Sequence, residues 1–441
     1  MATMIILGLG SNLNDRLANL RHALKLIKQL PHVTVVQVSP VYASDAQVPP
    51  NAQEAWRLPF LNVAIRCETD LAPIKLHEQL VKIEEQVGRL ERHERWAPRI
   101  IDIDILAWGD VEINTDTLTV PHKHLLERPF ALWPLADVAP FWSYKGKTAA
   151  EMVEVWGSRF AGDAPFHTHQ IFQRIDTPEL VGIVNATPDS FSDGGQFLSA
   201  HKAMQQTMQL VYSGATVIDI GAESTAPTAP PIDAKTEWER LEPVLQAIHA
   251  IKNNLFIPPK VSIDTRNAEV AEKALLYNID WINDVSGLDD PAMRKVVASS
   301  SVDCVIMHHL DIPENRQKSL PRQEDPAKLV FQWGEERINT LEKQGISRER
   351  IIFDPGIGFG KTAEQSFYIL RHVSMFKNLG VRVIVGHSRK SFFTNFTGLP
   401  SINRDIETTA VSLYLAKQHV DYLRLHNVEF CARAIKIQTA L

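Results

Sequence analysis

Eight short apolar runs in the second part of the chain constrain the fold more than any other feature of the sequence. They begin at Leu180, Val217, Val261, Trp281, Cys304, Ile351, Val383 and Tyr422. Each run ends in residues that can do chemistry; the first leads into Asn185 and then a polar loop that closes on two glycines. Short apolar runs bounded by polar and turn-forming residues are typical of buried strands. The pattern predicts eight buried strands with polar side chains at their carboxyl ends.

Helical patterns separate these runs. Asp290-Pro291 and Asp325-Pro326 each place an N-cap residue before a proline in the first helical turn. Strand–helix units repeated over residues 176–441 have the size and rhythm of a (β/α)8 TIM barrel, whose active sites lie at the carboxyl ends of the strands. A doubly wound open sheet is the alternative that the same periodicity allows.

The composition indicates a globular protein without a nucleic-acid or membrane partner. Its 441 residues suggest more than one domain, and 44% of them are hydrophobic. The formal net charge of −6 is evenly spread, which favours neither nucleic acid nor a membrane surface. Cys67, Cys304 and Cys431 each lie in an apolar run, as expected for buried thiols in a reducing compartment. Because a strand begins at Met4, we expect no targeting segment and a cytoplasmic location.

The first part of the chain predicts two helices among four strands. The expected strands cover residues 4–10, 33–42, 60–68 and 100–108, and the expected helices cover residues 14–30 and 73–90. Their order, β-α-β-β-α-β, matches the ferredoxin-like α+β arrangement. Residues 44–58 have no apolar period and are expected to form a loop. We therefore expect a ferredoxin-like domain over 1–160, a linker over 161–176 and the barrel over 177–441.

Two carboxylates on the last expected strand of this domain are candidate magnesium ligands. Asp102 and Asp104 are two residues apart, so both project from the same face of the strand. Paired carboxylate oxygens suit Mg²⁺ that is shared with substrate phosphates. Arginines precede the strand at positions 89, 92, 95 and 99, and arginine binds phosphate through paired hydrogen bonds. The alternative for both features is an ordinary solvated surface.

Several motifs of this first domain resemble 6-hydroxymethyl-7,8-dihydropterin pyrophosphokinase. They are residues 8–12 (GLGSN), 95–99 (RWAPR), 102–104 (DID) and 120–122 (VPH). The resemblance implies ATP-dependent transfer of a diphosphoryl group to the pterin hydroxymethyl group, with release of AMP. It implies that Asp102 and Asp104 hold two Mg²⁺ ions, with Arg89 and Arg99 as further catalytic residues. The phosphate contacts that it implies are Arg89, Arg95, Arg99, His122 and Arg128.

The same resemblance implies a pterin site between aromatic rings. Phe60 and Phe130 would stack on the pterin, Asn62 would hydrogen-bond to its edge, and Trp96 would lie nearby. Core packing is the alternative for the two phenylalanines. Glu91 departs from relatives that carry a basic residue in this loop, which affects loop closure rather than the reaction.

The barrel resembles dihydropteroate synthase over its full length. The motifs that carry the resemblance are residues 185–195 (NATPDSFSDGG), 219–225 (DIGAEST), 262–265 (SIDT), 282–284 (IND), 354–361 (DPGIGFGK), 388–390 (SRK) and 424–426 (RLH). The implied reaction joins 7,8-dihydropterin-6-methyl diphosphate to p-aminobenzoate and releases diphosphate and 7,8-dihydropteroate. The substrates of the whole chain would be ATP, 6-hydroxymethyl-7,8-dihydropterin and p-aminobenzoate.

The resemblance also implies a role for each polar strand end. Arg424, His426 and a Mg²⁺ ion at Asn185 would assist departure of the diphosphate, at the strands where barrels commonly bind phosphate. Asp264 and Lys390 would be catalytic and bind the pterin. The other expected pterin contacts are Asn283, Asp354, Met307 and Phe359, and the expected p-aminobenzoate contacts are Phe191, Thr225 and Ser391. Such barrels often dimerise, so we expect that a homodimer could form through the barrel helices.

One loop departs from the pattern of relatives, and two other functions compete with this interpretation. Relatives often carry arginine where this chain has Ala226, so we expect weaker retention of diphosphate by that loop. A pteridine-dependent methyltransferase barrel is the alternative enzyme, and the motif at 388–390 argues against it. A half that has become a pterin-binding or scaffolding module is the alternative of another class. Loss of Asp102, Asp104, Lys390 or Arg424 would indicate such a module, and all are present.

Overall fold

The computed structural model describes residues 2–89, 96–156, 168–171, 173–186, 195–223, 232–252, 258–312 and 318–440; side chains 195–200 and 440 are excepted. Contacts divide the chain into Met1–Asp176, here called the first unit, and Thr177–Leu441, here called the barrel unit. The segment expected as a linker contains a short strand, β10 (His169–Gln170), which pairs with β3 (Tyr42–Ser44) of the first unit. Among the described residues, no helix has the length and apolarity that a membrane crossing needs.

The first unit is built on a 6-stranded antiparallel sheet. Besides β3 and β10, its strands are β1 (Thr3–Ser11), β2 (Val33–Val38), β4 (Phe60–Thr69) and β5 (Asp102–Trp108). Strand β1 lies between β4 and β5, and β4 also pairs with β2 and β3. The resulting order β5-β1-β4-β2 is ferredoxin-like, as the sequence predicts.

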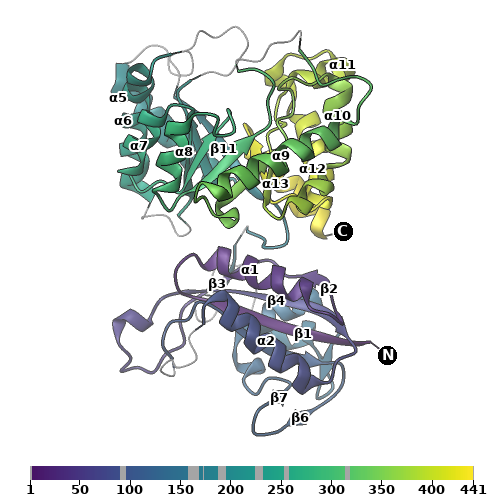
Figure 1. The fold of residues 1–441 in the computed structure, drawn as a ribbon. Helices are drawn as coiled ribbons and strands as arrows, with labels where there is room; N and C mark the ends of the chain where they lie inside the picture. The colour runs from purple at the N-terminus through teal and green to yellow at the C-terminus, as the bar shows by residue number, and fades with distance from the viewer. Residues whose placement is uncertain are drawn as a thin grey trace. The chain divides into compact units, whose positions relative to one another are not determined.

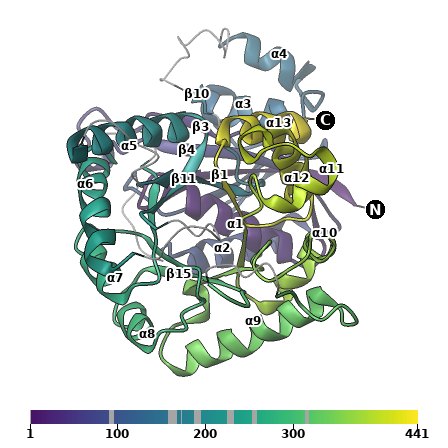
Figure 2. The ribbon, with the colours of Figure 1, turned by 90° about the horizontal axis from the view of Figure 1, so that it is seen from above.

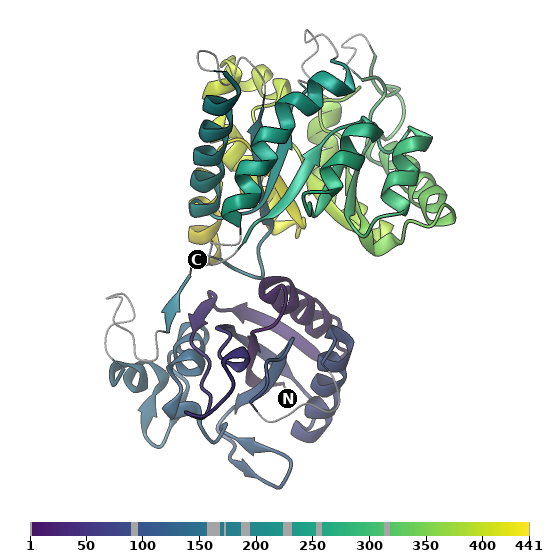
Figure 3. The same cartoon turned by 90° about the vertical axis from the view of Figure 1, so that its left-hand side faces the viewer.

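Helices cover both faces of this sheet because its central strands are apolar on both sides. Helices α1 (Arg16–Gln29) and α2 (Pro73–Val87) lie side by side and bury leucines against one face (Figure 1). Helices α3 (Pro129–Val138) and α4 (Ala149–Glu154) pack on the other face (Figure 3). The smaller strands are β6 (Ile113–Asn114), β7 (Thr119–Val120), β8 (Ser143–Tyr144) and β9 (Lys147–Thr148). The unit is therefore a three-layer arrangement with its sheet in the middle.

The expected strand over 33–42 is interrupted, which corrects the prediction of one continuous strand. Strand β2 ends at Val38, and β3 begins only at Tyr42. Pro40 lies in the gap and has no N–H for a sheet hydrogen bond. The hydroxyl of Ser39 instead accepts a hydrogen bond from the Ala64 N–H (2.9 Å). Apolar residues resume directly after the gap, so Pro40 was the one sequence signal of the break.

The barrel unit is a closed barrel of parallel strands, so the doubly wound alternative is wrong. Its strands are β11 (Glu179–Asn185), β12 (Ala215–Gly221), β13 (Lys260–Asp264), β14 (Trp281–Asp284), β15 (Asp303–Met307), β16 (Ile351–Asp354), β17 (Arg382–Val385) and β18 (Tyr422–Leu425). All coincide with the predicted apolar runs. Side chains such as Val181, Trp281 and Tyr422 fill the inside of the barrel.

Helices surround the barrel strands (Figure 2). They are α5 (Gly195–Tyr212), α6 (Ala234–Lys252), α7 (Ala268–Leu275), α8 (Pro291–Ala298), α9 (Pro326–Lys343), α10 (Ala363–Arg371), α11 (Thr394–Thr397), α12 (Asp405–Lys417) and α13 (Val428–Ala440). The predicted caps of α8 and α9 are confirmed: Asp290 accepts a hydrogen bond from the Ala292 N–H (2.8 Å), and Asp325 accepts one from Ala327 (2.9 Å). These caps fix the residue at which each helix begins.

Candidate active sites

The first candidate site is a cavity of about 150 Å³ in the first unit, beside strands β1, β4 and β5. Its lining includes most of the predicted site residues of this unit: Phe60, Asn62, Trp96, Arg99, Asp102, Asp104, His122, Arg128 and Phe130. Arg89 is joined to this group through Asp102. Arg95 and Glu91 lie outside the described residues. The structure thus gathers residues that are as much as 70 positions apart in the sequence.

Asp102 is held by two arginines. Its carboxylate oxygens accept hydrogen bonds from Arg89 Nη1 and Arg99 Nη1, each at 2.8 Å. These arginines neutralise one carboxylate and fix its orientation, because charge-assisted hydrogen bonds are strong and directional.

Asp104 differs from its neighbour because no described residue donates a hydrogen bond to its side chain. Burial raises its pKa, and repulsion by Asp102 adds to the shift. A divalent cation would remove this repulsion, so the pair fits Mg²⁺. Within the described parts of the chain, no three acidic, histidine or cysteine side chains form a metal site. Substrate and water would therefore supply the other ligands.

Glu84 is a component of this site that the sequence analysis did not predict. Its carboxylate accepts the Ile103 N–H (2.7 Å) and a hydrogen bond from Arg89, and burial raises its pKa to about 7. It therefore links the end of α2 to the strand that carries the paired carboxylates. The available signal was its spacing: Glu84 follows Leu80 by one helical turn on the buried face of α2.

The other cavity residues divide into a basic edge and a flat wall. Burial and the nearby Arg128 together lower the pKa of His122 to about 4, so this imidazole is neutral at pH 7. Phe60 and Phe130 are half-buried and line the cavity, so they are not ordinary core residues. Asn62 is buried and donates to the Ser44 hydroxyl (2.9 Å). A flat aromatic ligand with polar edges suits this wall.

The second candidate site lies at the carboxyl ends of the barrel strands and has Asp219 at its centre. Asp219 is fully buried and accepts hydrogen bonds from Ser262 Oγ (2.6 Å), Asn283 Nδ2 (3.0 Å) and Arg424 Nε (2.6 Å). Arg424 also donates to Asp264 (2.7 Å). Asp219 therefore orders side chains from three other strands, β13, β14 and β18.

The charges of this network depend on one another. Burial raises the pKa of Asp264, and the Arg424 guanidinium opposes that shift. Burial opposes the charge of Arg424, yet Asp219 and Asp264 together raise its pKa. A buried guanidinium shared by two carboxylates holds both in fixed positions. The Asp264 carboxylate is therefore placed as an acceptor for a polar ligand.

A separate group on the same barrel end combines an apolar wall with a lysine. Met307, Phe359 and Val285 form a small buried cluster, and Lys390 Nζ lies 4.2 Å from the centre of the Phe359 ring. Asp354 accepts the Gly356 N–H (2.7 Å). Burial raises the pKa of Asp354, and Lys390 opposes the shift. Polar groups beside an apolar wall suit a flat heterocycle.

The groups expected to assist departure of the diphosphate at the last strand are not all cationic. Burial and the charge of Arg424 together lower the pKa of His426 to about 3, so His426 is neutral at pH 7. Its Nδ1 lies 3.0 Å from Ser388 Oγ. Arg389 is bound by Asp405 (2.7 Å) rather than directed at a ligand. Asn185, the last residue of β11, and Ser391 are exposed, while Phe191, Thr225 and Ala226 lie outside the described residues.

Comparisons with known proteins match both halves of the chain. Residues 6–140 match the family of 7,8-dihydro-6-hydroxymethylpterin-pyrophosphokinase, and residues 181–426 match the pterin binding enzyme family. A folate synthesis bifunctional protein of Chlamydia caviae is 35% identical over 98% of this chain and 97% of its own length. One from Arabidopsis thaliana is 34% identical over 99% of this chain and 96% of its own.

A solved structure supports the barrel. Dihydropteroate synthase from Anaplasma phagocytophilum, solved with bound 6-hydroxymethylpterin-monophosphate, is 42% identical, covers 59% of this chain and 98% of its own, and has a TM-score of 0.54. The fold and the two family matches together define a pterin-processing transferase with two domains. The chain belongs to the family of bifunctional folate synthesis proteins. It carries a hydroxymethyldihydropterin pyrophosphokinase and a dihydropteroate synthase, which act in succession on the pterin.

Proposed function

We propose that the cavity of the first unit is where the diphosphoryl group passes from ATP to the pterin. The observation that carries this proposal is the pair Asp102 and Asp104 on one face of β5, at the cavity. Asp102 and Asp104 would hold two Mg²⁺ ions, which neutralise charge on the transferring phosphates when bound. Arg89 and Arg99 orient Asp102, and their guanidinium charges lie beside the position proposed for the transferring phosphates. Replacement of Asp102 with asparagine tests this assignment through the rate of AMP formation.

The remaining cavity residues bind the two substrates. Arg128 and, outside the described residues, Arg95 contact ATP phosphates, and neutral His122 contributes a hydrogen bond. Phe60 and Phe130 stack on the pterin, with Trp96 near its edge. Asn62 can hydrogen-bond to the pterin because its side chain is already fixed by Ser44. The flat wall and the paired carboxylates share one cavity, which supports transfer between adjacent substrates.

Removal of the Phe130 ring tests the pterin assignment. Phe130→Ala is expected to weaken 6-hydroxymethyl-7,8-dihydropterin binding about two- to tenfold, since an aromatic stacking contact contributes about 0.5–1.5 kcal/mol. Titration calorimetry measures this change. Phe141→Ala is the matched control, because Phe141 is in the same unit but 87% exposed. Equal affinities of parent and Phe130→Ala would contradict the assignment.

In the barrel we propose that the pterin diphosphate lies across the strand ends and meets p-aminobenzoate there. Met307 and Phe359 form the pterin wall, and Asp264, Asn283, Asp354 and Lys390 provide its polar contacts. Asp264 stabilises positive charge that develops at the pterin methylene. Arg424 and His426 face the diphosphate, and Asn185 contributes one ligand to a single Mg²⁺ that is otherwise held by substrate and water. Ser391, with Phe191 and Thr225, contacts p-aminobenzoate.

We further propose that two copies of the chain associate through α12 and α13. Ile406 and Tyr414 share one face of α12, and Phe430 and Ile437 share one face of α13. Their exposed fractions are 79%, 39%, 46% and 63%, on helices that pack against each other. Large exposed apolar side chains at helical spacing mark an association surface.

The three cysteines are buried and unbridged, which supports a reducing, cytoplasmic location.

A charge on this surface is expected to separate the copies. Ile437→Asp should give a monomer in sedimentation velocity where the parent gives a dimer, because a carboxylate in an apolar interface is costly to desolvate. Leu276→Asp is the control, since Leu276 is 81% exposed at the end of a different helix, α7. A monomeric parent, or an Ile437→Asp variant that remains dimeric, would refute this surface.

A further inference from the structure

The residue before Lys390 has an unfavourable backbone conformation. Arg389 has φ = 58°, in the left-handed region that residues other than glycine rarely adopt. Such a conformation persists only where the surroundings hold it. Lys390 follows immediately, so whatever holds Arg389 also fixes the path of the chain that carries the lysine.

Arg404, directly before α12, holds the carbonyl groups of this turn. Its side chain is only 8% exposed. Nη1 donates to the carbonyl oxygens of Lys390 (2.9 Å) and Arg389 (3.2 Å). Nε donates to the Leu399 carbonyl (2.8 Å), and Nη2 donates to Thr394 Oγ1 (2.7 Å). A rigid guanidinium therefore ties the turn to the segment that follows it.

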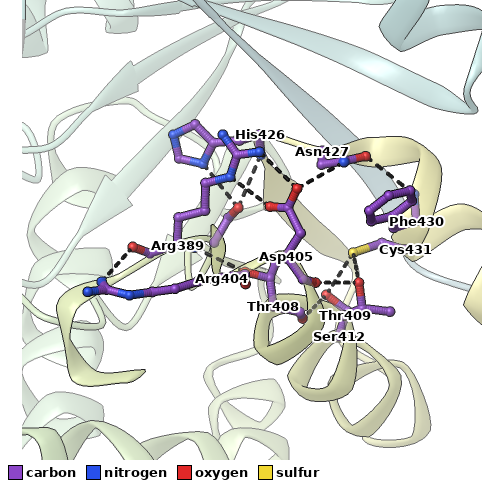
Figure 4. Close-up of polar contacts among 11 residues, drawn as sticks. Arg389, Arg404, Asp405, Thr408, Thr409, Ser412, His426, Asn427, Phe430 and Cys431 are labelled. Atoms are coloured by element: carbon purple, nitrogen blue, oxygen red, sulfur yellow. Dashed lines mark hydrogen bonds and ion pairs between the residues drawn. The ribbon is translucent and has the colours of Figure 1, made fainter. Parts of the chain in front are cut away.

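The first turn of α12 also holds the N–H of Arg389. That N–H donates to Thr408 Oγ1 (3.1 Å), and the Thr408 hydroxyl donates to the Arg404 carbonyl (2.7 Å). Both main-chain polar groups of Arg389 are thus satisfied by the same short stretch of chain. Figure 4 shows Arg404 and Thr408 on this stretch, beside Arg389.

Asp405 connects this turn to the loop after the last barrel strand. Its carboxylate accepts hydrogen bonds from Arg389 Nε (2.7 Å) and Nη2 (2.9 Å). The same carboxylate accepts one from Asn427 Nδ2 (3.0 Å), and Asn427 follows His426 (Figure 4). These bonds to Arg389 lower the pKa of Asp405, so it stays ionised. One residue thus links the loops that carry Lys390 and His426.

We propose that Arg404 and Asp405 are positioning residues of the dihydropteroate synthase site. Arg404 sets the position of Lys390 through the Arg389 turn, and Asp405 keeps the two loops in register. Neither residue acts on substrate directly. This inference rests on the proposed role of Lys390. It gives Arg404 and Asp405, which hold the turn at Arg389, a function in the site. A buried arginine that serves stability alone is the competing explanation.

The test is Arg404→Ala, assayed with supplied pterin diphosphate and varied p-aminobenzoate. We expect kcat/KM to fall on the order of 100-fold, since small displacements of positioning groups cost about that much. AMP formation by the first unit should stay at the parental rate. Millimolar guanidinium should restore at least about a tenth of the lost kcat/KM by filling the emptied space. Arg404→Lys should be intermediate. Asp405→Asn should raise the KM for the pterin diphosphate, which Lys390 and His426 are proposed to contact, in a stably folded protein.

Arg350→Ala is the matched control for stability. Arg350 also donates to main-chain carbonyls, those of Val297 and Val302, but it precedes strand β16 at the opposite end of the barrel. The proposal is overturned if Arg404→Ala loses no more kcat/KM than Arg350→Ala, or if guanidinium restores nothing. A Lys390→Ala variant with parental rates would also overturn it, but would locate the error in the role of Lys390.

Discussion

Replacing Asp102 with asparagine is expected to lower AMP formation on the order of 1,000-fold, the scale of losing one preorganised electrostatic group. The asparagine keeps the shape of the side chain but removes its charge. Arg99 then loses its anionic partner, Arg89 keeps Glu84, and Asp104 is left as the only carboxylate of the pair. The loss of one negative charge beside these arginines would also weaken the attraction of Mg²⁺ to the site.

This loss should be confined to the first reaction. The rate of AMP release at saturating ATP and Mg²⁺ is the measurement, and Asp110→Asn is the control because Asp110 is exposed just beyond the same strand. Dihydropteroate formation from supplied pterin diphosphate should match the parent. AMP release within tenfold of the parent would show that Asp102 does not hold the metal.

Replacing Arg424 with methionine is expected to remove dihydropteroate formation and to lower the unfolding free energy of the barrel unit by about 3–5 kcal/mol, as when one partner of a buried ion pair is lost. Asp219 and Asp264 would be left as two buried carboxylates without their shared cation. Arg382→Met is the control, since Arg382 binds Asp303 in the same barrel away from the site.

The stability loss of Arg424→Met should depend on pH in a defined direction. Burial already raises the folded pKa of Asp264, and loss of Arg424 raises it further above the unfolded value. Between those two pKa values the folded state binds more protons than the unfolded state, so the free energy of unfolding falls as pH rises. Urea titrations at about pH 5 and about pH 8 should therefore show the larger deficit at the higher pH. An equal deficit at both would contradict this account of Asp264.

The strands and the paired carboxylates were predictable because they depend on local patterns. Each barrel strand is a short apolar run, and Asp102 and Asp104 share a face through the two-residue period of a strand. The break at Pro40 was missed because apolar residues resume directly after it.

The partners of the site residues were not predictable from such patterns. Arg424 and Asp219 are 205 positions apart, and nothing near either indicates the other. The neutral state of His426 and the pairing of Arg389 with Asp405 arise from burial and from a helix packed behind the site. Arg389 and Lys390 are adjacent in the sequence, yet Arg389 pairs with Asp405 whereas Lys390 lies over the Phe359 ring.

The comparisons also decide among the functions that the sequence left open. A methyltransferase barrel would not explain a relative named as a folate synthesis bifunctional protein that matches 98% of this chain. The alternative that one half has become a binding or scaffolding module is also disfavoured. The predicted residues come together in both halves, in the cavity of the first unit and at the barrel strand ends. Ala226 remains the departure whose effect on diphosphate retention is to be measured, by restoring arginine there and comparing diphosphate affinity.

The central claim, two separate sites for successive reactions, is tested most directly by following both products in one reaction. The mixture contains ATP, Mg²⁺, 6-hydroxymethyl-7,8-dihydropterin and labelled p-aminobenzoate, with parent, Asp102→Asn or Lys390→Ala protein. The parent should form AMP and dihydropteroate, and Lys390→Ala should form AMP alone. Asp102→Asn should form neither product, and added pterin diphosphate should restore its dihydropteroate formation but not its AMP formation. A Lys390→Ala protein that loses AMP formation, or an Asp102→Asn protein that added pterin diphosphate does not rescue, would contradict the claim.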